Sequence, residues 1–164
     1  MPLARSLEEN LAEIKERLGV GITFDVLIRE LTVGGRDAAL VFIDGFIKDT
    51  ATVHILKFLL KLAREDLAPQ PIEKVLRTGL PYFEVETVST VDEVVDQVLA
   101  GPAALLIDGQ TEAIIIDVRE YPVRSIEEPD LERVTRGSRE GLVETIVFNT
   151  ALIRRRLRDP DLRF

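Results

Sequence analysis

The stretch AALLIDGQTEAIIID, residues 103–117, decides the fold of this chain. Asp108-Gly109 is a strong signal for a tight hairpin turn, and it stands between two apolar runs at residues 103–107 and 112–118. Both runs have the length of strands rather than of core helices. They therefore predict two strands joined at Asp108-Gly109 and buried within a sheet.

A second hairpin is predicted earlier in the chain. Gly34-Gly35 is a tight-turn signal between residues 23–33, which are rich in β-branched side chains, and the fully apolar run at residues 38–43. A run with no polar side is typical of a strand that is covered on both faces. We therefore expect a hairpin over residues 23–43, with its second strand inside the sheet.

Helices are predicted around these strands. Ser6 with Glu9, and Thr90 with Glu93, form capping boxes that open two helices with apolar residues at helical spacing. Another helix is expected to start at Asp49 and to be broken by the prolines at positions 69 and 71, before a short helix over residues 72–76.

The order of these elements predicts the fold class. With a further strand over residues 82–88 the order is α-β-β-α-α-β-α-β-β-α. Helices and strands that interleave in this way indicate an α/β (α+β mixed) fold, with a mixed sheet of four to five strands and helices packed on it. The 164 residues fit a single lobe with α/β halves at 1–66 and 70–118.

The C-terminal part is predicted to differ from the rest. Periodicity fades over residues 119–138, where prolines and charges favour an extended segment that wraps the core. A long helix is expected over residues 139–159, with acidic residues early and arginines late, which complements the helix dipole. Its apolar residues are predicted to form one stripe at helical spacing, made by Leu142, Ile146, Ile153 and Leu157 and widened by Val143, Val147 and Ala151.

Composition and charge exclude several classes of function. Apolar residues make up 46% and charged residues 30%, as in ordinary globular proteins, and the net charge of -8 disfavours nucleic acid or anionic lipid as general partners. The chain has no Cys, and its single His54 rules out a multi-histidine metal centre. No run reaches the ~18 apolar residues of a membrane helix, so the chain taken alone is expected to be soluble and intracellular.

No catalytic constellation can be assembled from this sequence. His54 lies among apolar helix positions, where a lone histidine is ordinarily structural or at the surface. Asp44 and Asp108, each followed by glycine, can be read as paired acids, but capping of a turn is their more ordinary role. No phosphate loop, cysteine nucleophile or Gly-x-Ser-x-Gly motif is present. We therefore expect neither an enzyme nor a bound cofactor.

The concentrated basic patch of the sequence consists of Arg154, Arg155, Arg156 and Arg158. It is either a helix C-terminus that complements its dipole, or a surface for lipid headgroups or an acidic neighbouring domain. The segment RGSR, residues 136–139, precedes the last predicted helix and could hold an anion at the helix N-terminus. Alternatively, Gly137 only supplies a special backbone conformation there.

Three runs of this C-terminal part carry a resemblance: RSIEEP (124–129), VTRGSREG (134–141) and NTALIRRRLRDPDLR (149–163). They closely resemble the A-subunits of the GerA-type spore-germination receptors, and IVFNTALIRRR (146–156) is most similar to the stage V sporulation protein AF branch. The likeness spans nearly the whole chain, weakly before Ala38 and strongly from Val91 onward.

The resemblance implies where the protein is located in the cell, but it implies no catalytic activity. Family members are longer, with two cytosolic α/β lobes followed by a membrane domain, at the inner membrane of the bacterial spore. The chain is then an excised first lobe, or alternatively a natural short homologue. The implied partners are its own second lobe and membrane domain, other germination-receptor subunits and, in a homo-oligomer, further copies of itself. No catalytic residues or cofactors belong to the family.

Two roles remain open after these observations. The first is a non-catalytic lobe that mediates subunit assembly and couples a signal to an ion-conducting membrane domain, and it should show exposed apolar residues next to the basic helix end. The second is a sensing domain for a germinant or dipicolinate near Asp44 or Asp108. The expected interaction residues are the motif's polar and glycine positions: Arg124, Glu127, Glu128, Arg136, Gly137, Arg139, Glu144, Asn149, Arg154, Arg155, Arg156 and Arg158.

Overall fold

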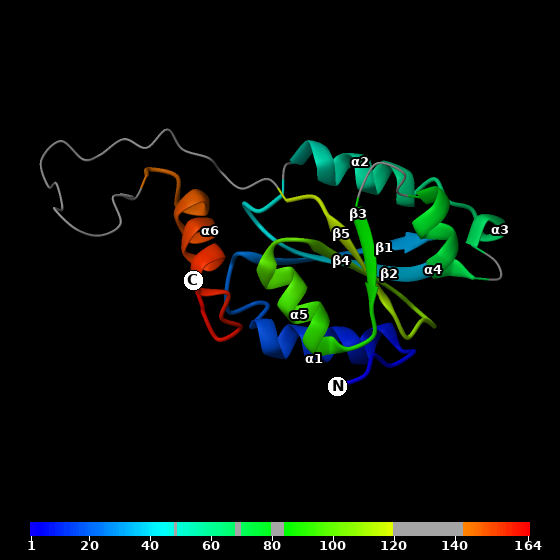
Figure 1. Cartoon of the computed structure of the whole chain (residues 1–164), viewed down its shortest axis with the longest axis horizontal. Coiled ribbons are helices and arrows are strands. Elements are labelled where there is room, and N and C mark those ends of the chain that lie inside the picture. Colours follow the sequence, from blue (N-terminus) through cyan, green and yellow to red (C-terminus); the bar gives the residue numbers. More distant parts are fainter. Residues whose placement is uncertain (48, 68–69, 80–83, 120–142) are drawn as a thin grey trace, which may run out of the picture.

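A computed structural model describes residues 1–47, 49–67, 70–79, 84–119 and 143–164 of the chain (Figure 1). The elements follow in the order α1 (Leu7–Leu18), β1 (Val26–Val33), β2 (Arg36–Ile43), α2 (Asp49–Leu59), α3 (Arg64–Leu67), α4 (Pro71–Lys74), the π-helical turn η1 (Val75–Gly79), β3 (Glu84–Val88), α5 (Val91–Ala100), β4 (Ala103–Ile107), β5 (Ala113–Asp117) and α6 (Ile146–Leu157).

Both predicted hairpins are confirmed. β1 and β2 pair antiparallel around the Gly34-Gly35 turn, with Val33 opposite Arg36, and β4 and β5 pair antiparallel across Asp108-Gly109. Gly34 and Gly35 have φ values of 54° and 72°, a left-handed conformation that glycine adopts at little cost. The two hairpins are therefore set by their turn residues.

All strands belong to one five-stranded sheet with the order β1-β2-β4-β5-β3. The predicted class and strand number are confirmed, but every described pair is antiparallel, whereas a mixed sheet was expected. The reason lies in the crossover through α5. It joins β3 to β4, which run in the same direction, but β5 inserts between them and pairs with both.

The sheet is covered by helices on both faces (Figure 1). Along β4, Ala104 and Leu106 pack in the core beneath α1 and α5, whereas Ala103, Leu105 and Ile107 pack toward α2 and α4. This alternation explains why the deciding stretch carries no polar side, since each face of a central strand meets a helix layer. The halves 1–66 and 70–118 thus contribute strands to a shared sheet.

Local polar contacts fix the helix ends. Thr90 and Glu93 form the complete capping box predicted for α5. At α1 the Ser6 hydroxyl accepts from the Glu9 amide at 3.3 Å, and the Leu7 amide donates to the Asp108 carboxylate at 3.0 Å. The turn between β4 and β5 therefore helps to cap α1, a long-range contact that the local pattern did not predict.

The middle helix differs from its prediction. α2 ends at Leu59 rather than at the prolines, and the separate short helix α3 follows before Pro71 opens α4. Ile55 and Leu59 are its fully buried residues, whereas Val53 and, in the turn after the helix, Leu60 are exposed. A helix that lies flat on a sheet needs only a narrow apolar stripe, so its other apolar residues remain at the surface.

The last helix is shorter than the predicted span of 139–159. α6 begins at Ile146, after Val143–Thr145, which are not helical. The Asn149 side chain accepts a hydrogen bond from the Val143 amide at 2.8 Å and donates one to the Val143 carbonyl at 2.5 Å. These two bonds fix the backbone of Val143 beside α6. The expected extended segment 119–138 lies outside the described residues, apart from Arg119.

Candidate interaction surface at the C-terminal helix

The inner side of α6 packs against the turn that follows β2. Gly45 has a φ of 81°, and a Cβ atom placed on it would lie 3.0 Å from Val147 Cγ1 and 3.1 Å from Ala151 Cβ. Position 45 therefore favours glycine for two reasons: its left-handed backbone conformation and the close approach of α6. The last helix thus packs directly on the Asp44-Gly45 turn.

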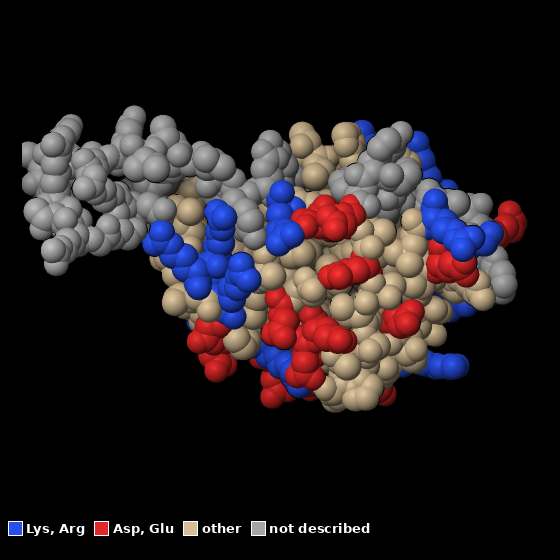
Figure 2. Space-filling model, viewed as in Figure 1, with Lys and Arg blue, Asp and Glu red and all other residues tan. Residues whose placement is uncertain are grey.

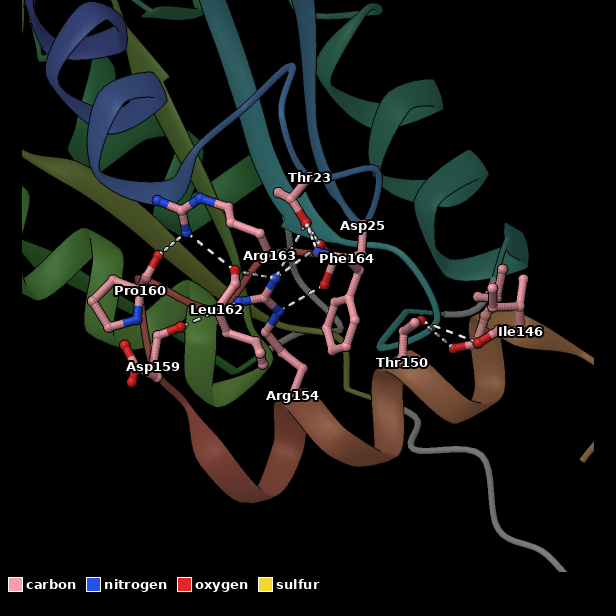
Figure 3. A network of polar contacts seen from close by, with 11 residues as sticks. Thr23, Asp25, Ile146, Thr150, Arg154, Asp159, Pro160, Leu162, Arg163 and Phe164 are labelled. Atoms are coloured by element: carbon pink, nitrogen blue, oxygen red, sulfur yellow. Dashed lines mark hydrogen bonds and ion pairs between the residues drawn. The ribbon is translucent and has the colours of Figure 1, made fainter. Parts of the chain in front are cut away.

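A buried ion pair holds the last turn of α6 (Figure 3). Arg154 Nε donates to Asp25 Oδ2 at 2.6 Å, and Arg154 Nη2 donates to Asp25 Oδ1 at 2.8 Å. The two side chains are 0% and 1% exposed. This two-pronged geometry is the one in which guanidinium and carboxylate match best.

The remaining donors of Arg154 also find acceptors inside the fold. Its Nη1 donates to the Asp159 carbonyl at 3.2 Å and its Nη2 to the Leu162 carbonyl at 3.1 Å, while the guanidinium lies 5.1 Å from the centre of the Phe164 ring (Figure 3). We name the group formed by Arg154, Asp25, Thr23 and Phe164 the Arg154 clamp. Because the chain turns back over the guanidinium, residues 158–164 are fixed against the start of β1.

Thr23 completes the clamp. Its hydroxyl donates to Asp25 Oδ1 at 2.6 Å and accepts from the Phe164 amide at 3.1 Å. Nearby, Arg163 Nη2 donates to the Arg17 carbonyl at 3.4 Å, and the Arg163 side chain lies over Gly19 at the C-terminus of α1. A cation at this helix end complements the dipole of α1.

The outer side of α6 is exposed and combines apolar with basic residues. We define the α6 surface as its exposed apolar and arginine side chains: Ile146, Phe148, Ile153, Leu157, Arg155, Arg156 and Arg158. Ile146 is 62% exposed and Leu157 59%. Figure 2 shows lysine and arginine side chains gathered over this part of the molecule. An apolar face rimmed by charge is a feature of surfaces that contact partners.

The expected interaction residues differ in their exposure and in their contacts. Glu144 is exposed just before α6, and Asn149 serves the local backbone contact with Val143. Arg154 is buried, so it does not contribute its charge to the surface on which we expected it. Arg124, Glu127, Glu128, Arg136, Gly137 and Arg139 lie outside the described residues.

The predicted apolar stripe of the last helix is confirmed only in part, because Ala151 is buried but other members are not, and Leu142 lies outside the described residues. Ile146, Ile153 and Leu157 are exposed, and the buried residues of α6 are Thr150, Ala151 and Arg154. Thr150 fits there because its hydroxyl hydrogen-bonds the carbonyls of Ile146 and Val147 at 3.2 Å and 3.1 Å (Figure 3). Polar residues whose donors find partners can replace apolar ones in a core. The sequence patterns also did not identify Thr23 and Asp25, which contact Arg154, because they too are polar residues in the core.

The two aspartates considered as paired acids lie apart. β2 and β4 are antiparallel, so Asp44 and Asp108 follow opposite ends of the sheet. Asp108 caps α1, and its own amide donates to the Asp37 carbonyl at 2.8 Å. His54 is exposed on α2. These residues therefore do not form a common site.

Described carboxyl groups with a clearly displaced pKa are shifted downward by hydrogen bonds. The pKa of Asp92 falls to about 2 because it pairs with the Met1 amino group and with Arg17. Hydrogen bonds from Thr90 and Ser89 lower the pKa of Glu93, and Arg119 lowers the pKa of Asp117. Such groups stay ionised near neutral pH, and each already serves a cap or an ion pair.

The fold and the α6 surface define an α/β lobe whose last helix is clamped on one side and exposed on the other. The family model of the Bacillus/Clostridium GerA spore germination proteins matches residues 12–164. The chain therefore belongs to the GerA spore germination protein family. Recognition from the C-terminal motifs is thus confirmed.

Individual relatives agree with this assignment. The chain is 40% identical over 159 residues to the stage V sporulation protein AF of Bacillus subtilis (strain 168), covering 97% of the chain and 32% of that protein. It is 35% identical over 167 residues to the spore germination protein GerLA of Bacillus cereus, covering 100% of the chain and 33% of that protein. The chain thus spans about a third of the length of these relatives.

A solved structure shares the fold. The crystal structure of the N-terminal domain of the A subunit of the Bacillus megaterium spore germinant receptor GerK3 aligns with a TM-score of 0.75 at 24% identity, over 99% of this chain and 59% of that one. Within the ranges that the structure describes, none of the helices has the length and hydropathy needed to cross a bilayer.

Proposed function

We propose that this chain is a non-catalytic lobe that mediates subunit assembly and signal coupling in a spore-germination receptor. The observation that carries the proposal is the two-sided character of α6. Its inner side is locked by the Arg154 clamp, whereas its outer side presents apolar and basic residues to solvent. A helix that is fixed on one side can transmit force from a partner on the other side into the sheet.

The similarity to known relatives supports a proposed place for the lobe. The GerK3 domain is the N-terminal domain of a receptor A subunit. We propose the same role here, on the cytosolic side of the spore inner membrane. The partners would be the rest of the same receptor polypeptide, another germination-receptor subunit, or a second copy of this chain. The α6 surface, together with Glu144 and the motif residues of 124–139, is the proposed contact.

A site-specific crosslinking experiment tests this proposal. A photo-reactive amino acid replaces Ile153 on the α6 surface, and as a matched control it replaces Glu8, which is exposed on α1. Both proteins are expressed in sporulating Bacillus subtilis, and crosslinked partners are identified by mass spectrometry. Crosslinks to a receptor subunit from position 153 alone support the proposal. Equal crosslinking from both positions, or none from position 153, would sink it.

The alternative role, direct sensing of a germinant or dipicolinate, is tested separately. Thermal unfolding is measured with amino acids, sugars, nucleosides, dipicolinate and simple ions. A ligand present at one hundred times its dissociation constant should stabilise the fold by ~2.7 kcal/mol, which raises the melting temperature by several degrees. A saturable shift with one class of compound would favour sensing over assembly, and a flat panel would leave assembly as the function of this lobe.

A further inference from the structure

A second exposed face lies on α2, across the sheet from α1 and α5 (Figure 1). Ile55 and Leu59 are fully buried beneath this helix. Val53, Phe58 and Leu60, on α2 and the turn after it, remain exposed, and Leu60 is 59% exposed. Three exposed apolar side chains thus lie on one helix and the turn after it.

Basic residues occupy the same face. Lys57, Lys61 and Arg64 are exposed, and no ion pair to any of the three is found within the described ranges. Val53 and Lys57 are one helical turn apart on α2, Leu60 and Lys61 lie in the turn that follows its end at Leu59, and Arg64 begins α3. Glu65 and Asp66 follow in the sequence and offset part of this charge. We define the α2 surface as Val53, Lys57, Phe58, Leu60, Lys61 and Arg64.

We propose that the α2 surface contacts an anionic lipid bilayer. Interfacial helices bury apolar side chains at the boundary of the headgroups, while lysine and arginine extend their charged ends to the lipid phosphates. Val53, Phe58 and Leu60 supply the apolar contact, and the three cations supply the attraction to negative headgroups. The inference rests on the proposed place of the lobe beside a membrane.

The charge distribution also orients the lobe. The first turns of α1 and α5 carry Glu8, Glu9, Asp92 and Glu93, on the opposite side of the sheet from α2. Because the whole chain has a net charge of -8, an anionic bilayer repels most of the molecule and attracts only its basic parts. The α2 surface is therefore expected to bind weakly and in a salt-sensitive manner.

Cosedimentation with vesicles tests the inference. The 164-residue chain is mixed at low ionic strength with vesicles of phosphatidylcholine, or with vesicles of phosphatidylcholine and phosphatidylglycerol in equal parts. We expect binding to the anionic vesicles only, and its loss on addition of salt. The paired substitution Lys57→Glu with Lys61→Glu should weaken binding by about tenfold or more, since each cation near such a surface contributes ~1 kcal/mol. Leu60→Asp should weaken it as well.

A matched pair on α6 distinguishes the two surfaces. Arg155→Glu with Arg156→Glu changes the same net charge on another exposed helix, and we expect it to retain vesicle binding. Equal loss in both pairs would show a general charge effect and overturn the inference. It would also be overturned by equal binding to neutral vesicles, or by no binding to either. Crosslinking from Ile153 does not depend on this result, so the proposed function can stand or fall by itself.

Discussion

Arg154 on α6 and Asp25 at the start of β1 form a buried, two-pronged ion pair across 129 residues of sequence. Neither side chain reaches solvent, and both oxygens of the carboxylate accept from the guanidinium. Burial of two charges is offset only when geometry and hydrogen bonding are nearly complete, as they are in the Arg154 clamp. The pair therefore decides where the last helix sits.

Loss of the arginine should destabilise the lobe strongly. Arg154→Met leaves the Asp25 carboxylate buried without its partner, and removing one member of such a pair costs about 3–5 kcal/mol. Arg156→Met, on the exposed side of the same helix, serves as the control and should cost no more than about 1 kcal/mol, because the contacts of an exposed arginine contribute little to stability. Urea denaturation measures both. Similar midpoints for the two variants would contradict the structural role of Arg154.

Replacement of both partners should cost less than the sum of the single changes. Asp25→Leu combined with Arg154→Met leaves no isolated charge, although the carbonyls of Asp159 and Leu162 lose their donor. We expect a coupling free energy of at least ~1 kcal/mol in a double-mutant cycle, because the residues are in direct contact. Strict additivity of the two single effects would show that the pair is not formed in solution.

The close approach of α6 to Gly45 gives a second test of its position. Gly45→Ala places a Cβ closer than van der Waals distance to Val147 and Ala151, and it also forces an L-residue to a φ of 81°. Gly35→Ala is the matched control, because its φ of 72° is similar but nothing lies within 4 Å. Both should lose about 1 kcal/mol from the backbone, and Gly45→Ala a further ~1–3 kcal/mol from overpacking. Equal thermal shifts would argue against this docking.

The elements set by local signals could be predicted from the sequence. Asp108-Gly109, Gly34-Gly35 and the Thr90 capping box act over a few residues, so the hairpins and α5 were correctly placed. The orientation of α6 could not be predicted in this way. Apolar periodicity pointed Ile153 toward the core, whereas the structure buries Arg154 because its partner Asp25 lies far away in sequence. No local pattern reveals a pair of that kind.

The end of α6 should be open to stabilisation. Arg158, its C-cap residue, has a φ of 46°, a left-handed conformation that costs a non-glycine residue roughly 1 kcal/mol. Arg158→Gly should therefore raise the free energy of unfolding by about 0.5–1 kcal/mol, less the small loss of a 3.3 Å bond to the Arg155 carbonyl. Arg158→Ala, which keeps the strain, is the control. A lower melting temperature for the glycine variant than for the alanine variant would refute this account.

The contact of Asp92 with Arg17 and with the Met1 amino group should affect how the stability of the fold depends on pH under acidic conditions. The pKa of Asp92 lies at about 2 in the folded chain, below its ordinary value of 3.8, because both cations favour the carboxylate. A group whose pKa is lowered on folding stabilises the fold above its unfolded value, and this contribution is lost as pH falls from about 4 toward 2. Asp92→Asn should therefore flatten the dependence of the melting temperature on pH in that window. Asp96→Asn, which removes another exposed carboxylate from α5, is the matched control, and identical slopes for both variants would show that the Asp92 contact is not made in solution.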